Sequence, residues 1–283
     1  MSFAKLSSAL LACNDAGPAV AAAPEQVAAR PAPARPAPAR HEGDLHKLLA
    51  HRLQALKLPA FGRDYERVAQ QCAAEGLDYA GFLLCLTELE LTERRQQLVE
   101  RRIREAQFPV VKRLDGFDFA ALPRLDEGLV RQLARCDYLA RHENVIATGG
   151  SGTGKTHLAV GLGLAACRKG LSVGYTTAAA LVTDLIEARG ERHLSRLQRR
   201  LAHYNLLIVD ELGYLPLPSG GAELLFEVFG RRGERGSTIV VSNRAPGEWA
   251  GIFGCERLAG ALLDRLTHRA HLLDVTGNSY RSR

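Results

Sequence analysis

The sequence predicts an α/β fold: a parallel β-sheet with helices on both faces, preceded by a small helical domain. Between residues 143 and 276, short apolar runs alternate with helical patterns, which is typical of a doubly covered parallel sheet. From 44 to 108, the apolar residues recur only at helical spacing. A glycine-rich loop stands between the first apolar run and the first helix of the alternating region. We therefore expect a three-layer α/β/α domain.

The glycine-rich loop has the pattern G-x-x-x-x-G-K-[ST], which predicts a phosphate-binding loop. It follows the apolar run 144–148 and precedes a helical pattern, the order such a loop requires. Without a Cβ, glycines let backbone N–H groups turn toward a polyphosphate, and the next helix adds its positive end. Lys155 would reach the β- and γ-phosphates, and Thr156 would ligate Mg²⁺. The loop consists of Gly149, Gly150, Ser151, Gly152, Thr153, Gly154, Lys155 and Thr156.

Two carboxylates follow the apolar run 205–209. On their own, Asp210 and Glu211 could be a solvated strand end. Together with a phosphate loop they predict ATP hydrolysis: Asp210 would hold Mg²⁺, and Glu211 would polarise the attacking water. The sequence therefore predicts an ATPase, with ATP and Mg²⁺ bound beyond the carboxyl ends of the strands.

Asn243 ends another apolar run, 237–242. Its amide would hydrogen-bond the attacking water or the γ-phosphate. The alternative is an asparagine that caps the next turn, a common role for this residue after a strand. Both interpretations stay open at this stage.

Three helices are expected in the N-terminal domain: from His46 to Pro59–Gly62, over 64–75, and over 79–104. The second half of the third helix is rich in arginine and glutamate, which favours a salt-bridged solvated face over contact with DNA or a partner. A second basic segment, 189–200, could grip phosphates.

The chain divides into three expected parts: 1–43, 44–108 and 109–283. The first is an alanine- and proline-rich extension, which we expect to be a disordered tether. Lys5 to Cys13 loosely resembles a lipoprotein signal, but its apolar run is short and interrupted. No apolar stretch has membrane-spanning length, and the six cysteines are scattered, so we expect a cytoplasmic protein without membrane contact. The net charge of +6 is weak support for a nucleic-acid partner.

Taken together, these motifs resemble the IstB family, the helper ATPases of bacterial insertion sequences, related to DnaC helicase loaders and DnaA initiators in the AAA+ class. The resemblance covers about residues 46–283. Its specificity comes from the linked set of motifs, because many NTPases share the phosphate loop. The matching segments are 149–159, 207–211, 213–216, 234–238, 242–243, 248–249, 257–258, 264–266, His268 and 279–281.

The resemblance also implies roles for single residues. His157 joins the nucleotide-binding segment, and Asn243 matches the sensor of the γ-phosphate. Arg265 matches the arginine that reaches a neighbouring subunit's ATP, which implies a homo-oligomer. The alternative for Arg265 is a salt bridge with Asp264 or Glu256 on its own helix. Arg281 is a weaker match to a second sensor, because the chain ends almost at once.

From this resemblance we expect an ATP-dependent DNA-binding helper of transposition. It would oligomerise on duplex DNA with little sequence preference and recruit or activate a partner transposase. A DnaC-like replicative helicase loader would share almost every motif and is the main alternative. A small-molecule kinase is a third possibility, disfavoured because the Asp210–Glu211 pair favours attack by water.

Overall fold

The computed structural model describes residues 42–254 and 256–277. Its contacts divide the chain into two compact units, 1–52 and 53–283, and we describe each by itself. Helix α2 (Glu42–Ala55) contains the described part of the first unit and continues into the second. Arg281 and most of the expected N-terminal tether lie outside the described residues.

The second unit begins with an antiparallel pair of helices, α3 (Pro59–Ala74) and α4 (Tyr79–Ala106). Their contact is a small apolar cluster around Val68, Cys72 and Leu86. The predicted extension of the first helix to Phe61 is wrong. Helix α2 ends at Ala55, Lys57 has a positive φ of 55°, and Pro59 starts α3, where its missing N–H costs nothing.

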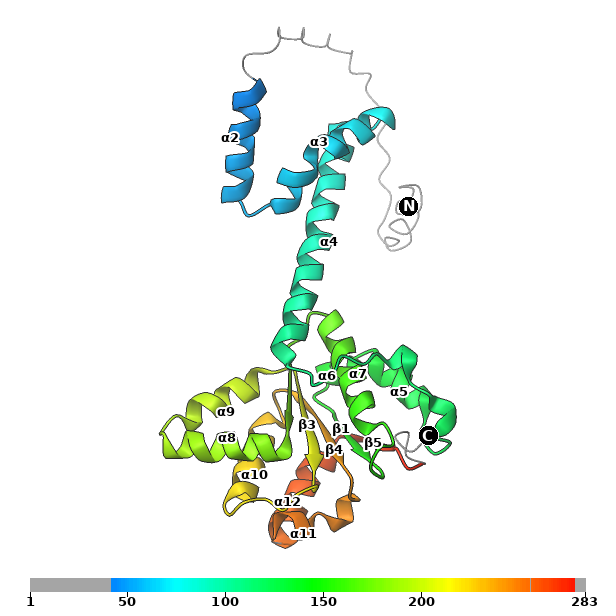
Figure 1. The fold of residues 1–283 in the computed structure, drawn as a ribbon, viewed down its shortest axis with the longest axis vertical. Coiled ribbons are helices and arrows are strands. Elements are labelled where there is room, and N and C mark those ends of the chain that lie inside the picture. The colour runs from blue at the N-terminus through cyan, green and yellow to red at the C-terminus, as the bar shows by residue number, and fades with distance from the viewer. Residues whose placement is uncertain (1–41, 255, 278–283) are drawn as a thin grey trace, which may run out of the picture. The chain divides into compact units, whose positions relative to one another are not determined.

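A five-stranded parallel sheet forms the centre of the unit, with the order β2-β3-β4-β1-β5 (Figure 1). Its strands coincide within a few residues with the apolar runs of the sequence, so the predicted parallel sheet is confirmed. The strands are β1 (Asn144–Thr148), β2 (Val173–Thr177), β3 (Leu206–Leu212), β4 (Ser237–Ser242) and β5 (Ala270–Asp274).

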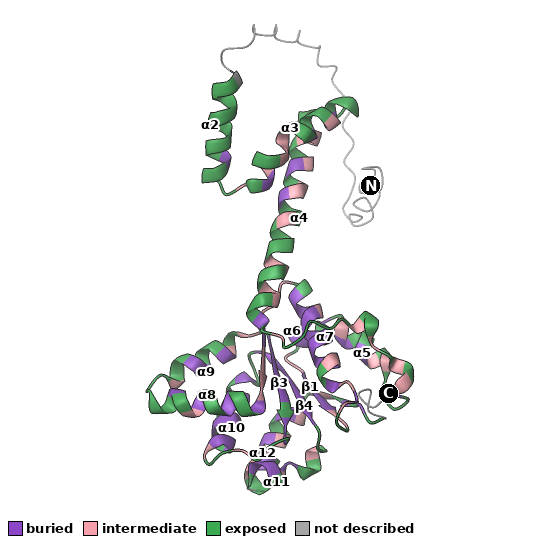
Figure 2. Ribbon diagram, in the orientation of Figure 1, coloured by how far each residue is buried: buried purple, intermediate pink, exposed green. Residues whose placement is uncertain are grey.

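Helices cover both faces of this sheet, which confirms the three-layer arrangement. Alternate strand residues enter two separate cores: Leu206 and Ile208 face one side, and Leu207 and Val209 face the other. Figure 2 shows the inner strands β1, β3 and β4 as buried over most of their length, whereas β2 and β5 at the two sides of the sheet are less buried. The first face carries α5 (Glu127–Ala134), α6 (Asp137–Ala140) and α7 (Lys155–Arg168). The second carries α8 (Ala178–Gly190), α9 (Leu194–His203), α10 (Gly221–Arg232), α11 (Ala250–Phe253) and α12 (Glu256–Thr267).

Short 3₁₀ turns complete the unit: η2 (Leu114–Gly116), η3 (Phe119–Ala121) and η4 (Pro246–Glu248). The first two belong to the segment that connects α4 to the sheet domain. In the described ranges, no helix is long and apolar enough to span a membrane.

The arginines in the second half of α4 are largely engaged within the protein. Arg94 pairs with Glu90 at 2.8 Å, and Arg102 pairs with Glu105 at 3.0 Å. Arg102 also donates from Nε to the Gly170 carbonyl at 3.0 Å, which joins α4 to the end of α7. This arrangement supports the salt-bridged interpretation of the segment.

Candidate nucleotide-binding site

The loop at 149–156 is shaped by glycines at positive φ. Gly149 has a φ of 154° and Gly154 a φ of 100°. A Cβ on Gly149 would lie 2.4 Å from the Val275 carbonyl oxygen, and one on Gly154 would lie 2.9 Å from the Phe117 ring. The loop can therefore take this path only with glycine at both positions.

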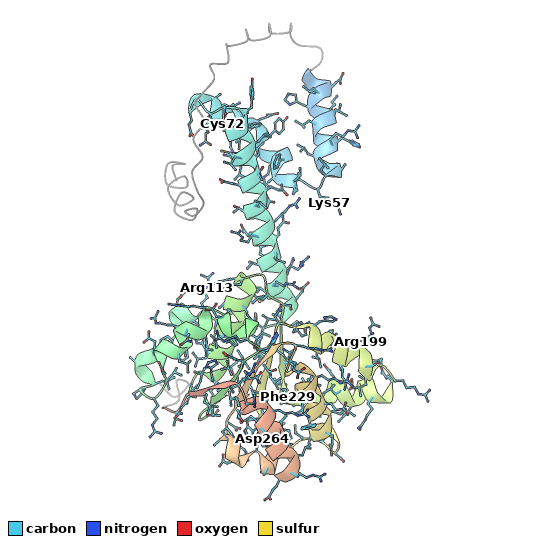
Figure 3. The ribbon with its side chains drawn as sticks, turned by 180° about the vertical axis from the view of Figure 1, so that it is seen from behind. Lys57, Cys72, Arg113, Arg199, Phe229 and Asp264 are labelled. Carbon is cyan, nitrogen blue, oxygen red and sulfur yellow. The ribbon has the colours of Figure 1, made fainter. Side chains whose placement is uncertain are left out.

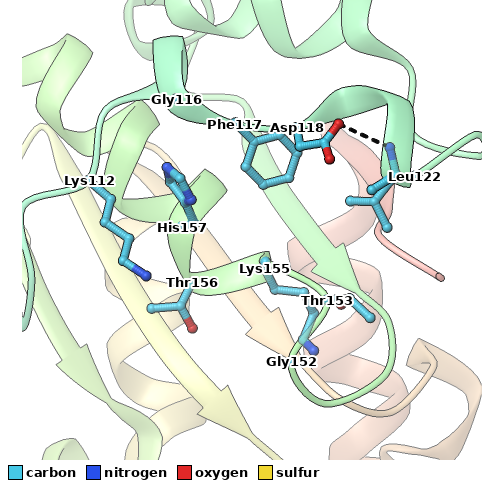
Figure 4. Close-up of a pocket in the computed structure, with 12 residues that line it drawn as sticks. Lys112, Gly116, Phe117, Asp118, Leu122, Gly152, Thr153, Lys155, Thr156 and His157 are labelled. Atoms are coloured by element: carbon cyan, nitrogen blue, oxygen red, sulfur yellow. Dashed lines mark hydrogen bonds between the residues drawn. The ribbon is translucent and has the colours of Figure 1, made fainter. Parts of the chain in front are cut away.

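Lys155 is the first residue of α7, and its ammonium lies inside the loop (Figure 4). Nζ donates to the carbonyls of Gly149 at 2.9 Å and Gly150 at 2.5 Å. Burial lowers the pKa of Lys155, and the negative charge of Asp210 acts against that shift. The lysine and Asp210 are thus close enough to interact, although they are 55 residues apart in sequence.

The other side chains of the loop are either held by a hydrogen bond within the loop or exposed to solvent. Thr153 is buried and donates from Oγ1 to the Gly150 carbonyl at 3.0 Å. Ser151 and Thr156 are exposed. Thr156 stands in the first turn of α7, so its hydroxyl is available to a ligand at the positive end of that helix.

Asp210 is buried at the end of β3, and both of its carboxylate oxygens are held. Tyr175 donates from Oη to Oδ2 at 2.8 Å, and the Glu211 backbone N–H donates to Oδ1 at 2.8 Å. Thr177 pairs with Asp210 in the β2–β3 ladder, so Tyr175, two residues earlier, lies on the same face as Asp210. Burial and the charge of Asp210 raise the pKa of Tyr175, which therefore remains a donor. Tyr175 fixes the orientation of the carboxylate.

Glu211 differs sharply from its neighbour. It is exposed, and its φ of 60° is unusual for a residue with a side chain. The pairing of β3 with β4 shifts register between Val209 and Leu212, which spans this residue. Such strained positions persist only where the surrounding structure fixes them, and they are common at functional sites.

Asn243 and Arg265 occupy two different places. Thr148 pairs with Ser242, so Asn243 and Gly149 follow aligned strand ends, and Asn243 is exposed there. Arg265 lies on α12, with its guanidinium carbon 4.3 Å from the centre of the Phe226 ring of α10. Among the described residues it forms no salt bridge with Asp264 or Glu256.

A cavity of about 330 Å³ adjoins the loop, and part of its lining was missed by sequence reasoning. The connecting segment contributes Lys112, Phe117, Asp118 and Leu122 to its walls (Figure 4). His157 contacts this segment: its Nε2 lies 2.8 Å from the Arg113 carbonyl oxygen, and its ring packs edge-on against Phe117 at 5.1 Å. The only signal in the sequence was a pair of phenylalanines, 117 and 119, in an otherwise aperiodic linker.

The arrangement is chemically coherent. One edge of the sheet brings together a glycine loop with a lysine, an oriented buried carboxylate, an exposed carboxylate and an exposed amide. Beside the loop lies a mixed polar and apolar cavity of the size that small-ligand sites have.

Comparison with known proteins identifies the family. A family model described as "IstB-like ATP binding protein" matches residues 51–283. A Pseudomonas aeruginosa protein named for insertion sequence IS21 and for ATP binding is 38% identical over 226 residues, covering 80% of this chain and 85% of the relative. A Geobacillus stearothermophilus protein similarly named for IS5376 is 36% identical over 228 residues, covering 81% and 91%.

Among solved structures, AMPPCP-bound DnaA from Aquifex aeolicus matches with a TM-score of 0.51 and 22% identity. The match covers 60% of this chain and 51% of the DnaA chain. At that identity it shows the fold alone, a parallel sheet covered by helices on both faces. With most of its length matched by the family model, the chain belongs to the IstB-like ATP-binding family.

Proposed function

We propose that this protein binds and hydrolyses ATP at the 149–156 loop and acts as an oligomer on duplex DNA to recruit or activate a partner transposase. One observation carries the proposal: the fold places Lys155 and the oriented Asp210 at the same edge of the sheet. The insertion-sequence relatives support a role in transposition over the alternative of helicase loading. The site of action would be the cytoplasm.

ATP binding is supported by the loop and its cavity. The triphosphate would lie on the loop and the N-terminal end of α7, where backbone N–H groups favour anions. Lys155 would exchange its carbonyl partners for phosphate oxygens, because an ion pair is stronger than a bond to a neutral carbonyl. The base would occupy the cavity beside Phe117 and Leu122.

Hydrolysis is supported by the two adjacent carboxylates. Thr156 and Asp210 would hold Mg²⁺, because hydroxyl and carboxylate oxygens are its preferred ligands. When bound, the ion neutralises charge that develops on the phosphates. Glu211 would orient a water molecule for attack, with its backbone anchored to Asp210 through the N–H bond at 2.8 Å. Asn243 would hydrogen-bond the γ-phosphate or that water.

Helix α9 is the best-supported surface for DNA. Its buried side carries Leu197 and Leu201, and its opposite side is exposed and rich in arginine. Arg199 points away from the sheet (Figure 3). Unlike the paired arginines of α4, the exposed arginines of this segment form no ion pair among the described residues. Over residues 189–200 they are Arg189, Arg192, Arg196, Arg199 and Arg200.

Oligomerisation would complete the site. Arg265 is exposed, and its guanidinium lies over the Phe226 ring. A guanidinium placed this way would reach the γ-phosphate of a neighbouring copy, so hydrolysis would depend on assembly.

The first test is ATP binding, ATPase activity and DNA binding of the wild type and Lys155→Ala. We expect the variant to lose ATP binding and the ATP-dependent part of DNA assembly, because it removes the charge that faces the phosphates. ATPase activity with and without duplex DNA, together with sizing in each nucleotide state, measures both effects. Equal assembly on DNA without any nucleotide would contradict the switch model.

The second test concerns α9. Arg196→Glu with Arg199→Glu should weaken DNA binding by about tenfold or more and flatten its salt dependence, since two phosphate contacts are lost. Arg95→Glu, an exposed change on α4, is the matched control, and we expect little change in DNA affinity from it. Equal losses from both variants would remove α9 as the specific DNA surface.

A further inference from the structure

A second groove lies on the connecting segment and shares only Phe117 with the lining of the nucleotide cavity. It has a volume of about 670 Å³ and runs between α5, α7 and the turn η2. Gly161 of α7 makes room for its wall, because a Cβ there would lie 2.5 Å from Leu114. Its apolar floor is formed by the half-buried Leu114, Phe117 and Phe119, with the buried Val130 and Leu164 beneath them in the lining.

The rim of this groove is positively charged. Four cations line it, against a single carboxylate, Asp115. Arg131 is partly neutralised by Glu127 at 2.5 Å. Lys169 donates to the Arg135 carbonyl, a contact that leaves its charge uncompensated. Arg168 is exposed and has no hydrogen bond or ion pair with the part of the chain that the structure describes.

We propose that this groove docks an acidic, amphipathic helical segment of a partner protein. The charge complementarity selects the acidic flanks, and the apolar floor selects leucine-like anchors at helical spacing, as in other helix-in-groove complexes. Duplex DNA matches the charge but has no apolar side chains to cover the half-buried Leu114 and Phe119. The inference goes beyond the proposed function, because the groove is distinct from the residues assigned to ATP hydrolysis and to DNA.

The test uses the full chain and a fluorescein-labelled synthetic helical peptide. The peptide has leucines at positions i, i+3, i+4 and i+7, flanked by glutamates, and binding is followed by fluorescence anisotropy. We expect saturable binding that weakens with salt, and binding at least about tenfold weaker for a matched peptide with lysine in place of glutamate.

Variants of the rim locate the binding. Arg131→Glu with Arg168→Glu should weaken peptide binding by about tenfold, and Arg168→Gln alone should weaken it by a few fold. Arg168→Lys should retain binding. Arg124→Glu, an exposed change outside the groove, should have no effect. Thermal melting and ATP binding of each variant show that the fold and the loop are intact. If the double variant does not fold, the Arg168→Gln and Arg168→Lys pair decides.

Three outcomes would overturn the proposal. The first is equal peptide affinity in the wild type and Arg168→Gln. The second is displacement of the peptide by a short duplex DNA whose own affinity falls in the same variants, which would make this a nucleic-acid surface. The third is self-association of the wild type that is lost in Arg168→Gln, which would make it an interface between copies.

Discussion

The amino ends of the parallel strands form one edge of the sheet and the carboxyl ends form the other. Polar residues have opposite roles at these two edges. At the amino edge, the polar side chains of Asn144 and Arg232 form hydrogen bonds within the protein, mainly to backbone groups of neighbouring elements. At the carboxyl edge, Thr156, Glu211 and Asn243 are exposed, and their side chains form no hydrogen bond within the described ranges. The difference separates residues that hold the fold from residues available to a ligand.

Arg232 shows the amino edge most clearly. It is buried, and burial lowers its pKa to about 10. Its guanidinium donates to the carbonyls of Leu201, Tyr204 and Ser237 and to Thr238 Oγ1, so it joins the end of α9 to the start of β4. Asn144 acts similarly: its Oδ1 accepts from the Thr238 N–H at 2.9 Å, and its Nδ2 donates to the Leu266 carbonyl at 3.2 Å.

The carboxyl edge contains one carboxylate fixed by hydrogen bonds, Asp210, and one whose side chain has none among the described residues, Glu211. Each carboxylate oxygen of Asp210 accepts one hydrogen bond, from Tyr175 or from a backbone N–H, whereas Glu211 is exposed and strained. A substitution at this edge should therefore affect chemistry and leave stability nearly unchanged. A substitution at the amino edge should do the reverse.

Glu211→Gln should give the largest effect at the carboxyl edge. We expect ATP binding to persist and hydrolysis to fall by about 10²–10⁴-fold, because an amide cannot accept a proton from water. The DNA-bound oligomer should accumulate, and the melting temperature should stay close to that of the wild type. Phosphate release and thermal melting measure the two quantities, with the exposed Glu223→Gln of α10 as the control. Normal turnover would remove Glu211 as the base.

Arg232→Met should give the largest effect at the amino edge. The change leaves several buried carbonyl groups without donors, so we expect a loss of about 3–5 kcal/mol in the free energy of unfolding. ATP affinity of the folded variant should change only by a few fold. Urea unfolding measures the loss, and Arg231→Met is the matched control, because that neighbour is exposed. If both variants unfold at the same urea concentration, the amino edge does not have the structural role assigned to it.

The sequence predicted best what is encoded locally. The loop, the apolar strands and the Asp210–Glu211 pair are short motifs whose meaning depends on adjacent residues, and the fold that they imply is confirmed. Helix α9 was recognised only as a basic segment, because arginines hide its leucine periodicity. Phe117 lines the cavity because an aperiodic linker packs across α7. No local sequence pattern indicates that this linker takes that path.

Contacts between segments that are distant in sequence could not be predicted, for a further reason. Tyr175 reaches Asp210 only because β2 and β3 are neighbours with Thr177 opposite Asp210. Strand order and register decide this contact, and neither follows from the apolar pattern of a single strand. The same applies to Arg265. Its guanidinium contacts the Phe226 ring, and among the described residues it forms neither of the salt bridges, with Asp264 or Glu256, that the sequence of its own helix suggested.

Tyr175→Phe should give the smallest effect and tests whether orientation of Asp210 matters. The change removes one hydrogen bond to the carboxylate at 2.8 Å and keeps the ring, so the fold should tolerate it. Loss of such a partner behind a metal ligand typically weakens metal affinity by about 10–100-fold, and we expect the lower end of that range. The ATPase should then need more Mg²⁺ for half-maximal activity, with little change at saturation. A Mg²⁺ titration measures this, with Tyr214→Phe as the control, because Tyr214 is exposed beyond the strand. An unchanged Mg²⁺ requirement would mean that the Glu211 N–H alone orients Asp210, and the carboxyl edge would then depend on the backbone as much as the amino edge does.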